Sequence, residues 1–360
     1  MPDSTHGAAR ILRRAGLALF GVLLALALGE AALRLAGYAP APPHDPDAWH
    51  VREVDDAREL ALRPGFVGDV AGVDVRYNAL GYRGPVEGDA PRRIVVLGDS
   101  ITYGLYLPYE ETFAAQLDER REDADVFSLA VLGWDTVNEV AALELDGLAL
   151  HPDVVVLQVC LNDSTVAAPA LAFVERLRLF RGSVVSRSRV AQALVARWYQ
   201  AEIDDTDAWL NRPEVFAQRY ADSIAPVEDA PTRMLMRRVA TELPDGGVWE
   251  RGWTLPQRVG HFRFGLDRLR ALADEHGFGV VVLIVPHLVG QPGEPYPFGP
   301  IHDLIRHEAE RHDFTVVDPT DAFVEAGPAR LQARQGDLVH PDARGHALLA
   351  EALDRGIDAL

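Results

Sequence analysis

The sequence predicts an α/β protein built on a parallel, five-stranded sheet with helices on both faces. Five short runs of mostly Val, Ile and Leu are each long enough for one strand, and unbroken apolar strands are typical of a sheet that is covered on both sides. Segments with helical spacing alternate with these runs, which indicates parallel βαβ units. The expected strands are residues 93–97, 125–130, 152–159, 279–285 and 314–318.

The expected helices follow these strands in order. They cover residues 111–121, 136–148 and 343–360, and a mostly helical insertion is expected at about 165–257, with helical spacing at 171–181 and 190–199. In parallel sheets of this kind, ligands bind beyond the carboxyl ends of the strands. Residues that directly follow a strand are therefore the first candidates for a functional site.

The N-terminus carries a targeting or anchoring signal. An uncharged run, Ala15–Gly29, follows three arginines, Arg10, Arg13 and Arg14. A basic flank before an apolar run is the layout of a signal anchor or a signal peptide, and the positive flank favours an N-terminus inside with the remainder translocated. We expect residues 1–38 to anchor the chain in a membrane with the body extracytoplasmic. The open alternatives are secretion after cleavage and a buried soluble helix.

A linker separates this segment from the α/β body. Residues 40–46 contain four prolines, and the alternation at 73–77 favours a short β lead-in. Residues 39–92 are therefore interpreted as linker and lead-in, and residues 93–360 as the main domain.

Composition excludes several classes of protein. All 35 basic residues are arginine and the net charge is −19, so chemistry that needs a catalytic lysine is impossible and an acidic body argues against nucleic acid as a partner. Cys160 is the single cysteine, so neither an intrachain disulfide nor a Cys-based zinc site is expected. His302, His307 and His312 recur every five residues, which does not fit a metal-binding pair. We interpret them as a solvated helix face, and expect no metal and no cofactor.

A candidate nucleophile follows the first strand. Gly98-Asp99-Ser100 stands where that strand turns into a helix, so the hydroxyl of Ser100 is expected at the edge of the sheet, above a helix N-terminus that favours negative charge. A hydroxyl is a weak nucleophile and needs a base. Alone, a serine at this position is more often a helix cap.

A candidate base follows the fifth strand. Asp337 stands three residues before His340, a spacing that lets the carboxylate hold the Nδ1 hydrogen and leaves Nε2 to take a proton from Ser100. Both pieces are expected at the same edge of the sheet.

Together with Gly104, Gly133 and Asn162-Asp163, these residues resemble the four sequence blocks of the SGNH/GDSL hydrolases, in their usual order. The resemblance implies a flavodoxin-like three-layer α/β/α sandwich and a triad of Ser100, His340 and Asp337. It also implies an oxyanion hole made by the Ser100 and Gly133 backbone N–H groups and the Asn162 amide. The family usually has glycine where this chain has Cys160, which we expect to pack against the first strand as a small apolar group.

The resemblance implies a serine esterase that cleaves carboxylic esters, and we expect short-chain acyl or acetyl esters. The N-terminal anchor and the aromatic residues of the insertion favour a glycan ester, and a lipid ester is the other substrate class considered. Two alternatives stay open: an envelope glycan O-acyltransferase with the same triad, and a non-catalytic envelope protein that retains the fold. The triad would be identical in the first two, so the sequence does not separate them.

Overall fold

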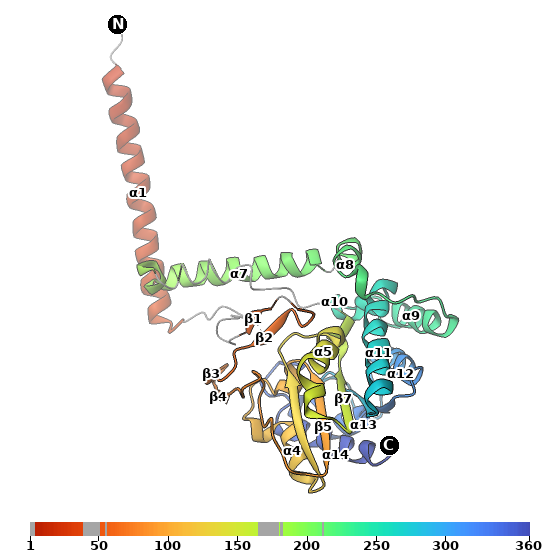
Figure 1. Ribbon diagram of the computed structural model, residues 1–360. Coiled ribbons are helices and arrows are strands. Elements are labelled where there is room, and N and C mark those ends of the chain that lie inside the picture. Colours follow the sequence, from red (N-terminus) through yellow and green to blue (C-terminus); the bar gives the residue numbers. More distant parts are fainter. Residues whose placement is uncertain (1–3, 39–50, 55, 165–179, 181–182, 211) are drawn as a thin grey trace. The chain divides into compact units, whose positions relative to one another are not determined.

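The computed structural model describes the chain except for residues 1–3, 39–50, 55, 165–179, 181–182 and 211 (Figure 1). It divides into two compact units. One comprises Met1–Asp45 with Pro169–Thr206, and the other comprises Pro46–Ala168 with Asp207–Leu360. The larger unit contains the sheet and every residue of the candidate site.

A five-stranded parallel sheet forms the centre of the larger unit. Its order is β6-β5-β7-β8-β9, which is strand order 2-1-3-4-5 and the flavodoxin-like arrangement. The prediction of a parallel five-stranded sheet is confirmed, with boundaries that differ by one or two residues. The strands are β5 (Arg92–Gly98), β6 (Ala124–Ala130), β7 (Val154–Val159), β8 (Gly279–Ile284) and β9 (Thr315–Val317).

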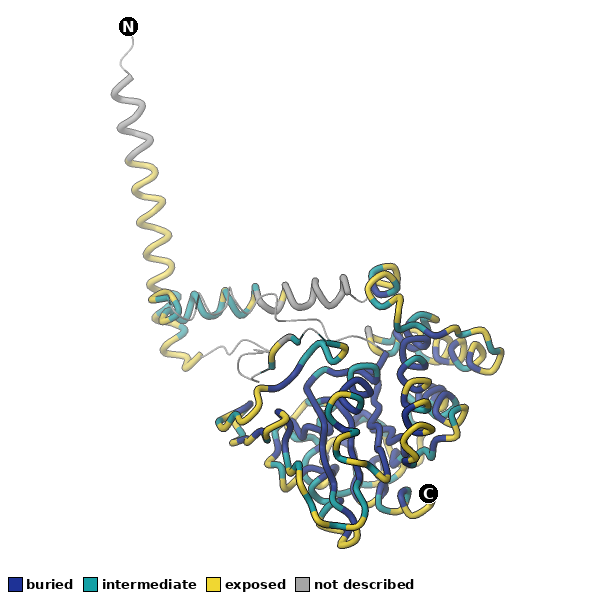
Figure 2. Tube along the Cα trace, viewed as in Figure 1, coloured by how far each residue is buried: buried dark blue, intermediate teal, exposed yellow. Residues whose placement is uncertain are grey.

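The sheet separates two apolar cores, as alternate strand residues point to opposite faces. On one face, Val95 and Val155 pack with side chains of α5 and α11, whereas on the other face Ile94 and Val154 pack with α4 and α14. Figure 2 shows the buried strands between less buried helices. The three-layer sandwich is therefore also confirmed. The helices are α4 (Phe113–Arg120), α5 (Thr136–Ala142), α11 (Pro256–His276), α12 (Gly299–Glu310), α13 (Thr320–Ala326) and α14 (Ala343–Ile357).

Side chains at the N-caps fix where these helices begin. Thr112 caps α4, Asp135 forms a capping box with Asn138 at the start of α5, and Asp342 caps α14. The predicted helix over 136–148 is too long, because α5 ends at Ala142 and continues as a π turn to Gly147. In this turn the Asp146 carboxylate accepts hydrogen bonds from Arg58 and Tyr82 of the lead-in, and these contacts favour the irregular turn over a regular helix.

The lead-in consists of two antiparallel hairpins. The first joins β1 (Val51–Glu53) to β2 (Leu60–Leu62), and the second joins β3 (Val67–Val70) to β4 (Val73–Arg76). The predicted alternation at 73–77 thus forms a strand.

Helix α1 (Ser4–Leu35) belongs to the smaller unit. Its portion Arg13–Leu35 is long and apolar enough to cross a membrane, and its described residues up to Leu28 are exposed. Near its end, the Glu30 carboxylate accepts hydrogen bonds from Ser188 Oγ (2.8 Å) and Val190 N (3.1 Å). Glu30 therefore has partners within the same unit, at the start of α7 (Arg189–Leu210).

The insertion is largely helical where it is described. It contains α7, α8 (Pro213–Arg219), α9 (Ala230–Glu242) and α10 (Val248–Gly252). The expected helix at 190–199 lies within α7, whereas the one at 171–181 falls almost wholly outside the described residues.

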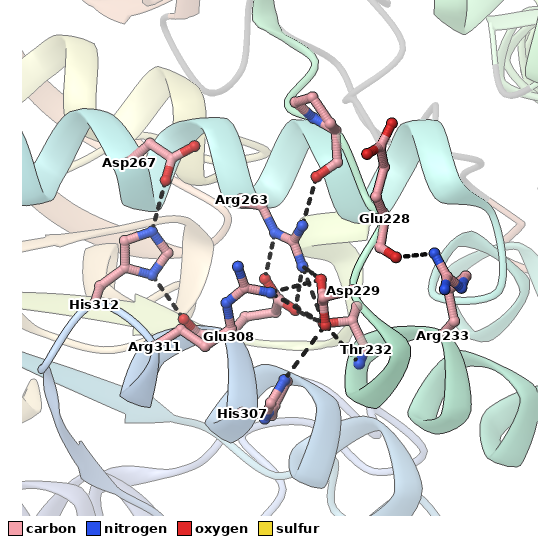
Figure 3. A network of polar contacts seen from close by, with 11 residues as sticks. Glu228, Asp229, Thr232, Arg233, Arg263, Asp267, His307, Glu308, Arg311 and His312 are labelled. Carbon is pink, nitrogen blue, oxygen red and sulfur yellow. Dashed lines mark hydrogen bonds and ion pairs between the residues drawn. The ribbon is translucent and has the colours of Figure 1, made fainter.

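A buried ion network joins α9, α11 and α12 (Figure 3). The Arg263 guanidinium bonds to both oxygens of Glu308 (2.7 and 2.8 Å) and to Asp229 Oδ2 (2.8 Å). Glu308 is fully buried, and removing one partner of a buried ion pair is costly. The network joins α11 to α12 and to the start of α9.

Candidate active site

The candidate residues lie together at the carboxyl ends of neighbouring strands. Ser100 follows β5, Gly133 follows β6 and Asn162 follows β7, all at the carboxyl ends of parallel strands. Because β5 lies between β6 and β7, the serine stands between the other two. The point where the strand order reverses is the usual ligand position in such folds.

Local geometry fixes the turn that carries Ser100. A Cβ atom at Gly98 would collide with Thr102 Oγ1 and Gln158 Oε1, so glycine is required there. Asp99 Oδ1 accepts a hydrogen bond from Ile101 N at 2.9 Å and caps the helix. That helix, α3 (Ser100–Tyr103), is only four residues long. The expected help from a helix dipole is therefore small, because the dipole of a single turn is weak.

Gln158 is a positioning residue that the sequence analysis missed. From β7 its Oε1 accepts hydrogen bonds from Thr102 Oγ1 (2.9 Å), Thr102 N (3.3 Å) and Asp99 N (3.3 Å). It therefore ties the nucleophile turn to the neighbouring strand. A polar residue inside an otherwise apolar strand was the available signal.

The structure brings Ser100, His340 and Asp337 together. Ser100 Oγ lies 2.9 Å from His340 Nε2, and His340 Nδ1 lies 2.8 Å from Asp337 Oδ2. The side chains of His340 and Asp337 are 17% and 18% exposed, so the imidazole is accessible from solvent without being freely solvated. The serine and the histidine, 240 positions apart, are within proton-transfer distance.

Hydrogen bonds hold Asp337 ionised. Burial raises the pKa of its carboxyl group, but the hydrogen bonds from the His340 ring and from the His340 and Val339 backbone N–H groups lower it to about 2. Asp337 Oδ1 accepts from Val339 N at 2.9 Å and from His340 N at 3.0 Å. One carboxylate therefore folds the loop and also orients the imidazole.

The two other expected oxyanion donors, Gly133 and Asn162, lie in the segments that follow β6 and β7. Gly133 has φ of 80° in the turn after β6, a conformation that favours glycine. Asn162 Nδ2 donates to Asp99 Oδ2 at 2.9 Å, which fixes the amide beside the nucleophile turn.

Cys160 is fully buried in the core that contains Ile94 and Val96 of β5, as a small apolar group would be. Its Sγ lies 2.7 Å from Asn162 Oδ1. Burial, followed by the nearby Asp99 charge, raises the pKa of the thiol well above its ordinary value. The thiol is therefore a packing and orienting group for Asn162, not a nucleophile.

Arg83 is a second residue that sequence reasoning missed. It is 3% exposed, and its guanidinium donates to the carbonyl oxygens of Tyr103 (2.8 Å), Gly104 (3.1 Å) and Leu107 (2.8 Å). These carbonyls belong to the segment directly after the nucleophile turn. The lead-in therefore supports the site, which no motif in the sequence indicates.

A buried acid lies near the nucleophile turn. Glu139 of α5 is fully buried, and neither of its carboxyl oxygens has a hydrogen-bond partner in the described part of the chain. Burial, and then the charges of Asp163 and Asp99, raise the pKa of Glu139 well above its ordinary value. Glu139 therefore ionises less readily than an exposed glutamate.

The interpretation of His302 as part of a solvated helix face is wrong. His302 is 3% exposed, and its Nδ1 lies 3.1 Å from Asp318 Oδ2 at the end of β9. The residue turns inward because α12 packs against the sheet there. Among the described residues, no group of three or more His, Cys, Asp or Glu side chains is arranged to hold a metal ion.

A comparison with known protein families identifies the family of this chain. The model of the GDSL-like Lipase/Acylhydrolase family matches residues 96–348, most of the chain and all the candidate site residues. The chain belongs to this family. It is thus an ester hydrolase of the SGNH type.

Several solved structures are similar over most of their length. A catalytic mutant of Axe2, an acetylxylan esterase from Geobacillus stearothermophilus, is 16% identical, with 74% of this chain and 94% of that chain covered and a TM-score of 0.41. The acetyl xylan esterase AlAXEase is 13% identical, with coverage of 74% and 99% and a TM-score of 0.40. LAE5, an alpha/beta hydrolase enzyme from the metagenome of Lake Arreo, Spain, is 18% identical, with coverage of 75% and 97% and a TM-score of 0.37. No curated protein matches the chain.

Proposed function

We propose that this family member cleaves carboxylic esters through an acyl-enzyme formed on Ser100, with His340 as base and Asp337 as its orienting carboxylate. The observation that carries the proposal is the continuous hydrogen-bonded row from Ser100 Oγ to His340 Nε2 (2.9 Å) and from His340 Nδ1 to Asp337 Oδ2 (2.8 Å).

The geometry supports a two-step mechanism. His340 Nε2 takes the proton of Ser100 as Oγ attacks the ester carbonyl, and a tetrahedral oxyanion forms. When that intermediate collapses, the C–O bond to the alcohol breaks and Nε2 returns the proton to the alcohol oxygen. Water, deprotonated by the same imidazole, then attacks the acyl-enzyme and releases the acid.

The proposed oxyanion hole comprises the backbone N–H groups of Ser100 and Gly133 and the side-chain amide of Asn162. All three follow neighbouring strands, and the contact of Asn162 with Asp99 holds its amide in place before substrate arrives. Pre-set donors stabilise the oxyanion without reorganisation, and one such donor is worth about 2.7–4 kcal/mol of barrier.

A p-nitrophenyl ester panel from C2 to C12 tests the proposal with the full-length chain in detergent. Wild type is expected to hydrolyse at least one ester, while Ser100→Ala is expected to lose at least about 10³-fold in kcat. Equal rates for both proteins would overturn the proposal. Adding a sugar acceptor separates hydrolysis from transfer. If the products contain free acid and no acylated sugar, the result supports the esterase over the O-acyltransferase.

We propose further that α1 anchors the enzyme with its catalytic unit outside the cytoplasm. The apolar portion of α1 and the arginines before it, Arg10, Arg13 and Arg14, support this orientation. Protease added to intact cells or spheroplasts is expected to cleave the catalytic unit. Protection until the membrane is lysed would contradict this orientation, and recovery of a shortened chain in the medium would indicate cleavage and secretion instead.

A further inference from the structure

Tyr106 stands beside the proposed base in a strained conformation. It follows α3 closely, has φ of 76°, and meets the His340 ring edge-on at 5.6 Å between ring centroids. A non-glycine residue in the left-handed region costs about 1–2 kcal/mol, and such strain concentrates at functional sites. The observation points to a role for the Tyr106 ring beside the imidazole.

The Tyr106 ring carries a stacked arginine. The Arg334 guanidinium carbon lies 3.7 Å from the ring centroid, and Nη2 donates to the Ala71 carbonyl at 2.5 Å. The loop holding Arg334 also carries Asp337 and His340, and its base is closed by the hydrogen bond from Ala333 N to His340 O (3.0 Å). The Tyr106 ring, the Ala71 carbonyl and the loop that also carries His340 therefore hold Arg334 in place relative to the His340 imidazole.

Arg334 is an exposed cation without an acidic partner: within the described ranges no carboxylate forms an ion pair with it. Asp337 is the acidic group in its loop, and that carboxylate is engaged by His340 and two backbone N–H groups. In a chain of net charge −19, Arg334 places a positive charge beside the site while most of the surface repels anions.

The proposed mechanism places the alcohol part of the ester near the positive charge of Arg334. His340 must hand its proton to the leaving alcohol, so the alcohol lies beside the imidazole. The His340 side chain is 17% exposed, Tyr106 is likewise partly buried, and Arg334, which stacks on Tyr106, is exposed. The three side chains therefore lead from the reacting oxygen towards solvent.

We propose that Arg334, stacked on Tyr106, is a specificity-determining residue that binds an anionic group, a carboxylate or a phosphate, on the alcohol part of the ester. This inference rests on the proposed esterase function. A guanidinium held flat on an aromatic ring keeps its planar donors in a fixed geometry, which suits two-point contact with such oxyanions.

The test compares three acetate esters with the full-length chain in detergent: 4-acetoxybenzoate, the neutral 4-acetoxybenzamide, and 4-acetoxyphenyl phosphate. The ratio of anionic to neutral kcat/KM is measured for each variant, and comparing this ratio between variants cancels the differences in leaving-group reactivity. Arg334→Gln is expected to lower this ratio about 2- to 5-fold, mainly through KM, as the loss of an exposed ion pair would. Arg334→Lys is expected to retain much of it, and added salt to reduce the wild-type ratio. A preference for the carboxylate or for the phosphate identifies which anion the site takes.

Arg355→Gln is the matched control. It removes the same charge from the last turn of α14, whose first turn follows the His340 loop, and is expected to leave the ratio unchanged. If Arg334→Gln slows the anionic and neutral esters equally, Arg334 serves only to hold the Ala71 turn and the proposal is overturned. An equal effect of Arg355→Gln would overturn it as well. If wild type hydrolyses none of the three esters and is not labelled at Ser100 by a fluorophosphonate, the underlying esterase proposal has failed instead.

Discussion

Replacing Asp337 by asparagine separates the two tasks of this carboxylate. In the Asp337→Asn variant the side-chain carbonyl oxygen would still accept from Val339 N and His340 N, so the loop is expected to keep its shape. The new amide NH₂ would take the place of Asp337 Oδ2, which lies 2.8 Å from His340 Nδ1. Nδ1 must then accept, the ring proton moves to Nε2, and Nε2 loses the lone pair that takes the proton of Ser100.

A wrong tautomer costs about 10³–10⁴-fold in kcat, or roughly 4–5.5 kcal/mol of barrier. The assay is steady-state hydrolysis of the best p-nitrophenyl ester, together with thermal unfolding. Asp342→Asn is the control, because that side chain caps α14 through Arg344 N and Gly345 N and is expected to affect stability more than kcat. A folded Asp337→Asn enzyme within tenfold of the wild-type rate would refute the proposed role of this carboxylate.

The geometry supports three further predictions. Gly133→Ala is expected to lower kcat about 10- to 100-fold at unchanged KM, because φ of 80° strains alanine and displaces the N–H; an unchanged kcat would exclude Gly133 from the oxyanion hole. Glu139→Gln is expected to raise the melting temperature more at pH 8 than at pH 4, since a raised pKa means that ionising Glu139 costs stability as pH rises above 4.5. An equal effect at both pH values would contradict the raised pKa of Glu139. Glu308→Ala is expected to destabilise the fold by about 2–3 kcal/mol, because buried Arg263 loses both Glu308 contacts and keeps only Asp229 as an acidic partner; chemical denaturation measures this, and a loss below about 1 kcal/mol would contradict the importance of this network.

The sheet was predictable because its strands carry a strong signal. Residues 93–97 and 152–159 are nearly unbroken β-branched and Leu runs, and the strands found there differ by at most two residues at either end. The helix over 136–148 was less predictable. Contacts from Arg58 and Tyr82, far away in the sequence, favour the π turn after Ala142, and no local pattern encodes them.

The candidate site was predictable where a residue with suitable chemistry follows the end of a predicted strand. Ser100 and His340 meet at 2.9 Å as their positions after β5 and β9 suggest. Arg83 could not be assigned, because its role depends on three-dimensional contacts with the segment after Ser100. Gln158 stands out as a polar residue in an apolar strand, but the sequence does not show that it contacts Thr102. His302 was misplaced because a five-residue spacing does not show which face of a helix turns inward.

Fluorophosphonate labelling followed by peptide mapping identifies the nucleophilic side chain, which we propose is Ser100. Trypsin cleaves after Arg93 and Arg120, so residues 94–120 carry Ser100 in one peptide. We expect one adduct per chain, located on Ser100 by fragmentation and absent from Ser100→Ala. An adduct on another residue, or none on a folded wild-type chain, would contradict it.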